Sequence, residues 1–190
     1  MEFKKLVFQY ALGNFTRDQL PAIAYKGLEE GFDSPSLVIL AGIERNESPA
    51  VVDRYFELVL IELNIAIPDI KALIIECAIL MAEEIIKNNA DIIEGISDIF
   101  NRALNKYDFF SESKEFAFDS IYFERVNGLY WEYDDLSMTI EAWDEKKSNQ
   151  DLMREIKEHL FEELKIWLVN IKSIGAPETQ NVASLRGEKM

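Results

Sequence analysis

The side chains that could do chemistry in this chain are mainly carboxylates, because it has 35 Asp and Glu residues but only one histidine and one cysteine. Four acids fall in two neighbouring apolar segments: Glu83, Glu84, Glu94 and Asp98. Hard cations such as Mg²⁺ prefer oxygen ligands, and acids on facing helices can supply them. One hypothesis is therefore a carboxylate-dependent metal hydrolase that acts on a phosphorylated metabolite. A solvated helix face is the favoured interpretation, because Lys87 follows Glu83 at the spacing of a surface ion pair.

A second acidic set, Glu155, Glu158 and Glu162, lies nearer the C-terminus and has the same two interpretations. Glu158 follows Arg154 at the spacing of a surface ion pair, which again favours a solvated face. The only histidine, His159, has no second histidine or nearby cysteine with which to build a metal site or a catalytic triad. We expect it at the margin of the core beside Glu155, and a role as a lone general base is the alternative.

The sequence contains no motif for a common cofactor. The glycine-rich loops that bind nucleotide phosphates, G-x-x-x-x-G-K-[ST] and G-x-G-x-x-G, do not occur. Cys77 has no second cysteine for a disulfide or a Cys-x-x-Cys site, and it lies in an apolar periodic stretch, so we expect a buried and inert thiol. The sequence thus predicts no cofactor and favours a protein without catalytic activity.

The most distinctive segment, Tyr107 to Glu145, is both aromatic and acidic. It holds 11 of the 22 aromatic side chains of the chain. It also holds 11 acids against two bases, Lys114 and Arg125, which leaves a surplus of nine negative charges. Large rings fill the space between helices efficiently, so we expect most of these aromatics to belong to the core.

Six consecutive residues of this segment are difficult to bury together: Tyr130, Trp131, Glu132, Tyr133, Asp134 and Asp135. No helix or strand points six consecutive side chains the same way, so some rings and some carboxylates must share an exposed edge. Exposed tyrosine and tryptophan among carboxylates are typical of a binding site for a cationic protein. We therefore predict that these six residues bind a basic partner protein.

The whole chain is acidic, with a net charge of −15. Such a protein repels phosphate backbones, because nucleic-acid affinity comes largely from cations that displace counterions. We expect no nucleic-acid partner and no membrane association, whereas a basic protein would be attracted over long range. The N-terminus has no apolar export-signal core and the chain has no disulfide framework, which predicts a cytoplasmic protein.

Apolar residues recur at helical spacing along most of the chain, and proline and glycine fall between these stretches. Two helix starts have the same chemistry, Ser34-Pro35 and Ser48-Pro49. In each, the serine hydroxyl can cap a free backbone N–H, and proline occupies the first helical position, where its missing donor costs nothing.

The most apolar stretch, Pro68 to Lys87, predicts a helix through the centre of the fold. Further helices are expected after Asp91 and after Ser148, which both resemble helix caps. We predict one helical domain over residues 1–172. The polar and aperiodic residues 173–190 indicate a C-terminal tail.

The turn signal Asn127-Gly128 interrupts the aromatic segment and leaves two interpretations open. A small β-hairpin over residues 123–132 is one, because Asn-Gly between apolar runs is the strongest short hairpin signal. A broken pair of helices is the favoured one, because an isolated hairpin is only marginally stable without a sheet to join.

The first third of the chain resembles a motif of small bacterial helical proteins. The residues that carry the resemblance are Gly27-Leu28-Glu29-Glu30-Gly31-Phe32-Asp33-Ser34-Pro35-Ser36-Leu37, then Leu40-Ala41-Gly42, Tyr55-Phe56-Glu57 and Leu63-Asn64. Some of those proteins act as immunity-type partners of toxins, so the resemblance implies a bacterial, intracellular, helical protein. It implies no catalytic residue, because the matching positions are those of helix starts.

The sequence therefore predicts an all-α protein, an irregular bundle of six to eight helices. The favoured function is a non-catalytic, acidic protein-interaction module, in its most specific form an immunity protein that neutralises a basic toxin or nuclease. The metal hydrolase is the alternative. A third hypothesis is a structural subunit of a larger assembly, which would form a stable homo-oligomer.

Overall fold

The computed structural model describes residues 2–44, 47–139 and 147–175. These residues form eight α-helices and four short 3-10 helices, and no strand occurs among them. The α-helices are α1 (Glu2–Ala11), α2 (Leu20–Glu29), α3 (Pro35–Ala41), α4 (Pro49–Glu62), α5 (Ile70–Asn88), α6 (Ile92–Arg102), α7 (Glu124–Met138) and α8 (Asn149–Gly175). The 3-10 helices are η1 (Arg17–Gln19), η2 (Leu104–Lys106), η3 (Phe109–Glu112) and η4 (Asp119–Ile121). The predicted all-α bundle of six to eight helices is confirmed.

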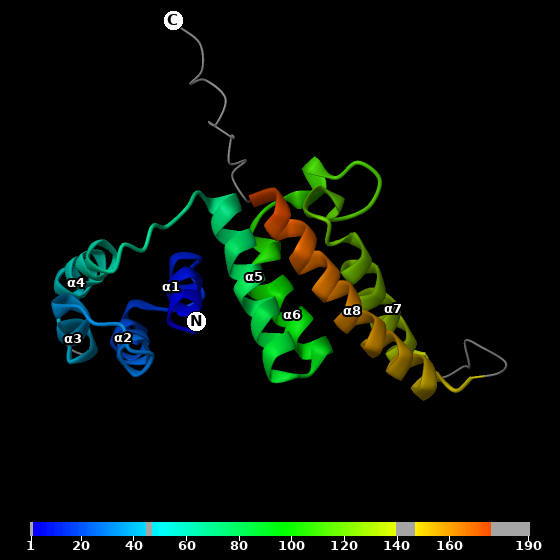
Figure 1. Ribbon diagram of the computed structural model, residues 1–190, viewed down its shortest axis with the longest axis horizontal. Coiled ribbons are helices and arrows are strands. Elements are labelled where there is room, and N and C mark those ends of the chain that lie inside the picture. The colour runs from blue at the N-terminus through cyan, green and yellow to red at the C-terminus, as the bar shows by residue number, and fades with distance from the viewer. Residues whose placement is uncertain (1, 45–46, 140–146, 176–190) are drawn as a thin grey trace, which may run out of the picture.

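The helices form two groups, α1 to α4 on one side of the molecule and α5 to α8 on the other (Figure 1). α1 joins the groups, because it packs on both α2 and α5. α5 is central, as predicted, and contacts α1, α6 and α8. Its buried face includes Cys77, whose pKa is raised to about 11 by burial, so the thiol stays protonated at neutral pH.

Local chemistry explains where several helices begin. Pro35 and Pro49 are the first residues of α3 and α4, as the sequence predicts, but the hydroxyl of Ser48 accepts no cap hydrogen bond, so the predicted serine cap of α4 is wrong. The hydroxyl of Ser34 accepts a hydrogen bond from the backbone N–H of Leu37 at 3.1 Å. The carboxylate of Asp91 caps the first turn of α6 in the same way. These caps satisfy N–H groups that have no partner within the helix.

α7 overturns the hairpin alternative for residues 123–132. The helix is continuous from Glu124 to Met138, so Asn127-Gly128 neither forms a turn nor separates two helices. Val126 and Leu136 are buried at helical spacing, and this tertiary packing outweighs the local turn preference. Gly128 lies on the exposed side of the helix, where an added Cβ would have no atom within 4 Å.

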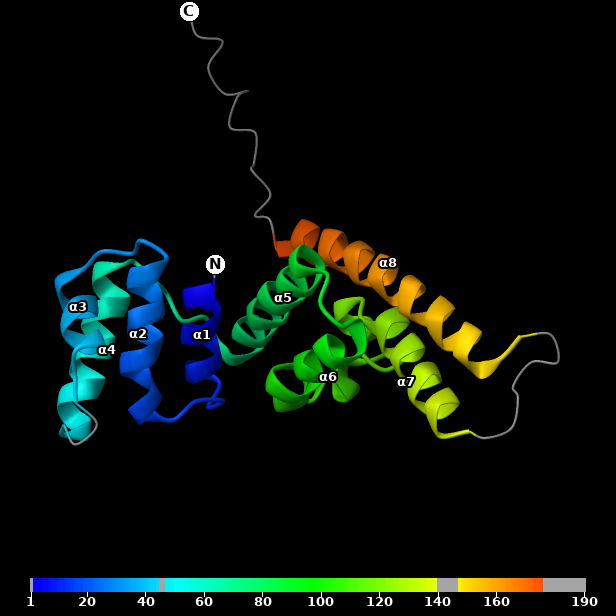
Figure 2. The ribbon, with the colours of Figure 1, turned by 90° about the horizontal axis from the view of Figure 1, so that it is seen from below.

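α7 and α8 lie side by side as an antiparallel pair at one end of the molecule (Figure 2). The indole N–H of Trp167 on α8 donates to the carbonyl of Ile121, 2.9 Å away, just before α7 begins. Residues 173–175 belong to α8, so the tail predicted over residues 173–190 starts later than expected, and residues 176–190 lie outside the described part of the chain. Within the described ranges, no helix has the length and apolar character needed to cross a membrane.

Candidate functional site

The six residues predicted to bind a partner lie on α7, and the helix points them in different directions. Tyr130 is half-buried, with its ring centroid 5.4 Å from that of Phe100 on α6. Tyr133 is half-buried against α8, where the ammonium of Lys157 lies 5.5 Å from its ring centroid. Trp131 is 54% exposed. Tyr133 therefore belongs to the α7–α8 contact, and Trp131 is the most exposed of the three rings in this run.

The three carboxylates of this run have no partner for their charge among the described residues. Glu132 and Asp135 are exposed and Asp134 is half-buried, and none of them forms an ion pair or a side-chain hydrogen bond with the described residues. Asp134 and Asp135 follow Trp131 by three and four residues, so they lie one helical turn further along the same side. The last turn of α7 also contains no basic residue that would compensate the negative end of the helix dipole.

Trp131 lines a cleft of about 540 Å³, here called the aromatic cleft, between α6, α7 and the loop that contains η2 to η4. No charged side chain of the described residues lines it. Its size and apolar lining are those of a binding cleft. Its aromatic lining residues are Phe100, Phe110, Phe118, Tyr130 and Trp131.

Three asparagines supply most of the polar lining of the aromatic cleft: Asn101, Asn105 and Asn127. Asn101 donates a hydrogen bond to the hydroxyl of Ser97 at 3.3 Å. The side chains of Asn105 and Asn127 have no hydrogen-bond partner among the described residues. Each of these amides can donate and accept hydrogen bonds, so it can bind both the N–H and the C=O groups of a peptide backbone. The sequence-based prediction missed these three residues.

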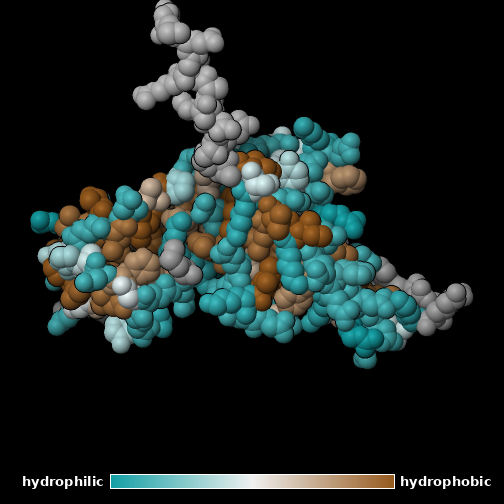
Figure 3. Space-filling view, in the orientation of Figure 1, coloured by the Kyte–Doolittle hydropathy of each residue, from teal (hydrophilic) through white to brown (hydrophobic). Residues whose placement is uncertain are grey.

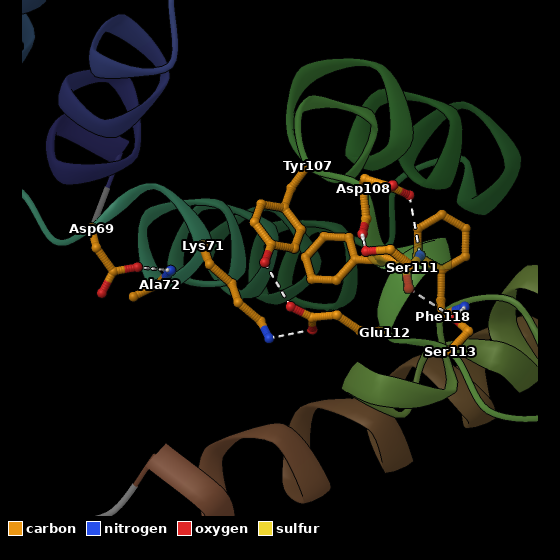
Figure 4. Close-up of polar contacts among 10 residues, drawn as sticks. Asp69, Lys71, Ala72, Tyr107, Asp108, Ser111, Glu112, Ser113 and Phe118 are labelled. Carbon is orange, nitrogen blue, oxygen red and sulfur yellow. Dashed lines mark hydrogen bonds and ion pairs between the residues drawn. The ribbon is translucent and has the colours of Figure 1, made fainter.

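The loop that forms one wall of the aromatic cleft is held on α5 by a cluster shown in Figure 4. The hydroxyl of Tyr107 donates to the carboxylate of Glu112 at 2.6 Å, and Lys71 on α5 forms an ion pair with the same carboxylate. The hydrogen bonds from Lys71 and Tyr107 lower the pKa of Glu112, and the bond to Glu112 raises the pKa of Tyr107. Glu112 therefore has a structural role.

Asp119 has a similar role within the loop. Its carboxylate accepts hydrogen bonds from three backbone N–H groups, those of Lys114, Glu115 and Phe116, with the shortest, from Glu115, at 2.8 Å. The hydrogen bond from Glu115 is the largest cause of a lowered pKa for Asp119. The loop conformation from Lys114 to Asp119 is thus organised around one carboxylate.

Two aromatic residues of the loop adopt a strained backbone conformation. Phe118, which lines the aromatic cleft, has φ of 65° and Tyr122 has φ of 60°. This left-handed region costs a residue with a side chain roughly 1–2 kcal/mol. A strained backbone conformation persists only where the surrounding contacts hold it. Residues in such conformations are common at binding sites. Here the imposing contacts include buried Phe109 and Phe123, whose rings both pack against that of Phe118.

The acidic aromatic segment is therefore divided by the fold. Of its ten described aromatic residues, six are buried or half-buried, as expected for core residues, and four are exposed: Phe110, Phe116, Tyr122 and Trp131. Glu112 and Asp119 hold the loop together, whereas the three carboxylates of α7 remain available. Residues 140–146 of the segment lie outside the described part of the chain, Trp143 among them.

The acids of the metal hypothesis do not assemble into one site. Glu84, Glu94 and Asp98 line a second cleft, between α1, α5 and α6, but Glu83 lies apart from it and forms an ion pair with Lys172 at 2.5 Å. Among the described residues, no group of three His, Cys, Asp or Glu side chains could hold a metal ion. The geometry therefore does not favour a metal hydrolase.

Two acids of the second set form surface ion pairs, but Glu158 does not pair with Arg154 as predicted, because Arg154 pairs with Asp151 at 2.9 Å. Glu155 pairs with Lys147 at 2.6 Å, and Glu162 pairs with Lys165 at 2.8 Å. His159 is exposed and does not lie at the margin of the core as predicted, and no interaction with Glu155 is present. These residues form a solvated helix face, the favoured interpretation of the sequence.

Comparison with protein-family models, with curated proteins and with solved structures finds no match for this chain. The resemblance of its first third to small bacterial helical proteins stays a prediction.

Proposed function

We propose that this chain is a non-catalytic binding module that docks a basic segment of a partner protein on the aromatic cleft and the adjoining carboxylates of α7. The observation that carries the proposal is the juxtaposition on one side of α7 of Trp131, which lines an uncharged aromatic cleft, and Asp134 and Asp135, which have no ion pair within the described residues. An apolar side chain would enter the cleft, and cations beside it would meet the carboxylates.

The aromatic cleft supports an apolar anchor. Burying one large apolar side chain contributes roughly 1.5–3 kcal/mol, and well-packed aromatic pockets are where interfaces concentrate their binding energy. Phe110 and Trp131 are 65% and 54% exposed, so both rings would lose solvent contact when the cleft is occupied. The free amides of Asn105 and Asn127 would hydrogen-bond the backbone that flanks the anchor.

The carboxylates support a cationic partner. They stand near the C-terminal end of α7, where the helix dipole already disfavours negative charge. A lysine or arginine from a partner would relieve both the mutual repulsion of Asp134 and Asp135 and their repulsion by the dipole. This end of the molecule has an almost uniformly hydrophilic surface over the outer ends of α7 and α8 (Figure 3).

The most specific form of the proposal is an immunity protein that covers the basic active cleft of a toxin or nuclease. Glu132, Asp134 and Asp135 would then occupy positions that substrate phosphates use in that enzyme. The net charge of −15 supports this form, because it speeds encounter with a basic protein over long range.

The test selects binding peptides from a random library displayed on phage, with the full chain as bait. We expect the enriched peptides to combine one large apolar residue with lysine or arginine. Titration calorimetry then measures the best peptide against Trp131→Ala, for which we expect affinity to fall by about thirtyfold or more, the effect of losing an interface hot spot.

The matched control is Phe116→Ala. Phe116 is 65% exposed and lies in the same segment, but it does not line the aromatic cleft, so its loss should leave the affinity unchanged. Enriched peptides without basic residues, or equal affinities for Trp131→Ala and the parent chain, would show that the proposed docking site is wrong.

A further inference from the structure

The second cleft, between α1, α5 and α6, has a volume of about 320 Å³ and shares no lining residue with the aromatic cleft. Part of its wall is apolar: Leu6, Phe15, Met81 and Ile85. The rest is polar, with four carboxylates against two cations, so the lining carries a surplus of two negative charges. We refer to it as the α1–α5–α6 cleft.

Most of the charges in this cleft are already paired. Three of its four carboxylates have a cationic partner: Glu84 with Lys5, Asp98 with Arg102 and Asp91 with Lys157. Glu94 is the exception among the lining carboxylates, because its side chain forms no ion pair or hydrogen bond with the described residues. The cleft thus offers one free anionic acceptor.

Gln9 provides the observation that points to a ligand. The residue lines the cleft and is only 3% exposed, yet its side chain has no hydrogen-bond partner among the described residues. Its amide is not sealed from the cleft, because the only fully covered and unbonded side-chain atoms in the described residues belong to Ser120 and Glu124. A group bound in the cleft can therefore reach this amide and form hydrogen bonds with it.

We propose that the α1–α5–α6 cleft binds a small primary amine with an aliphatic chain. A primary ammonium has three N–H donors, and the cleft has three free acceptors: the carboxylate of Glu94 and the side-chain carbonyls of Gln9 and Asn88. The positive charge matches the negative surplus of the lining. The aliphatic chain lies against the apolar wall around Phe15 and Met81.

A divalent metal ion fits this cleft less well than an amine. A metal ion needs several anionic or carbonyl oxygens at once, and binding it would require breaking the ion pairs of Glu84 with Lys5 and of Asp98 with Arg102. The side chain of Lys5 is also only 14% exposed, so its ammonium would lose its ion-pair partner where little solvent could replace it. An ammonium uses the acceptors that are already free and leaves both ion pairs in place.

The test titrates hexylamine into the full ¹⁵N-labelled chain at neutral pH and follows the backbone amide signals by NMR. We expect saturable shifts around Gln9, Asn88 and Glu94. Hexyltrimethylammonium has the same charge but no N–H donors, and hexanamide has no charge, so both should bind at least about tenfold more weakly.

Two variants test whether hexylamine binds in the α1–α5–α6 cleft. Glu94→Gln and Gln9→Leu should each weaken hexylamine by about tenfold or more, the effect of losing a hydrogen bond to a charged group. Gln9→Leu should fold at least as stably as the parent, because it removes an unpaired buried amide. Glu57→Gln, at an exposed position on α4 outside both clefts, should leave the binding unchanged.

Three outcomes would overturn the proposal. One is the absence of saturable shifts with hexylamine, and another is equal binding of hexyltrimethylammonium. The third is unchanged affinity in Glu94→Gln, which would place the bound amine elsewhere.

Discussion

Glu112 and Glu132 lie in the same acidic segment, and their neighbours give them different roles. The carboxylate of Glu112 accepts hydrogen bonds from Tyr107 and Lys71 and joins the loop to α5. Glu132 is exposed and has no such partner among the described residues. A carboxylate that is bonded in the folded state contributes to stability, whereas an unbonded one beside like charges opposes it. The segment therefore combines structural acids with acids that a partner can use.

The bonded carboxylates predict an acid-dependent stability. The pKa of Glu112 in the folded state lies below its ordinary value of 4.5, and that of Asp119 lies below 3.8. The unfolded chain therefore binds protons more readily in acid, which favours unfolding. The stabilisation is fully present above the ordinary values and is lost as pH falls through the lowered folded-state values. Urea unfolding at a series of pH values measures the free energy of unfolding and should show this decline.

Substitution of single carboxylates identifies the source of this acid dependence. Glu112→Gln should make the free energy of unfolding lower at neutral pH and less dependent on pH below 4.5, because the lowered pKa is gone. Glu132→Gln should leave the pH profile of the parent unchanged. If Glu112→Gln and the parent had the same profile, the cluster with Lys71 and Tyr107 would not stabilise the fold.

At the scale of the helix, two glycines show how packing decides the effect of one methyl group. Gly128 lies on the exposed side of α7, and an added Cβ would meet no atom within 4 Å. Gly95 lies on α6 facing α5, and an added Cβ would fall 2.5 Å from Cδ1 of Ile85. Glycine weakens a helix at either position, but only at Gly95 does the close approach of a second helix require it.

We expect Gly128→Ala to stabilise the protein by about 0.5–1 kcal/mol, because alanine loses less backbone entropy in a helix. Gly95→Ala should destabilise it by roughly 1–3 kcal/mol, the cost of overpacking a close contact. Urea unfolding monitored by circular dichroism measures both. A destabilised Gly128→Ala would mean that residues 127–128 do not belong to a continuous helix.

At the scale of the molecule, the rate of association with a basic partner depends both on the net charge of −15 and on where the carboxylates lie. The net charge attracts any cationic protein, wherever the negative residues lie. The rate at which a partner docks at one site depends most on the charges beside that site. Glu132, Asp134 and Asp135 stand beside the aromatic cleft. The exposed acids Asp33, Glu44 and Glu57 belong to the α1–α4 part of the chain.

This difference predicts unequal effects of two charge reversals. Replacing the three acids of α7 by lysine should slow association of the selected basic peptide by about tenfold or more at low salt and flatten its salt dependence. Replacing Asp33, Glu44 and Glu57 by lysine changes the net charge equally and should slow association much less. Stopped-flow fluorescence at several ionic strengths measures both rates, and equal slowing would leave α7 with no special role.

The sequence by itself determined most of the helices and several of their starts. Proline after serine at residues 35 and 49 and the carboxylate of Asp91 act within one helical turn, so their effect can be read from neighbouring residues. The apolar stretch of α5 likewise indicated the central helix, because helical spacing shows which face must be buried. The turn signal of Asn127-Gly128 is the exception, since packing on α8 outweighs it.

Only the tertiary structure decided which side chains meet. The asparagines of the aromatic cleft come from α6, η2 and α7, and Gln9 and Glu94 reach their common cleft from α1 and α6. No spacing along the chain relates Gln9 to Glu94. Their helices are brought together by the burial of apolar faces, and the pattern of apolar residues does not show which polar side chains will become neighbours. The acids of α7 were visible in the sequence, but their freedom from ion pairs depends on where the lysines and arginines of other helices lie.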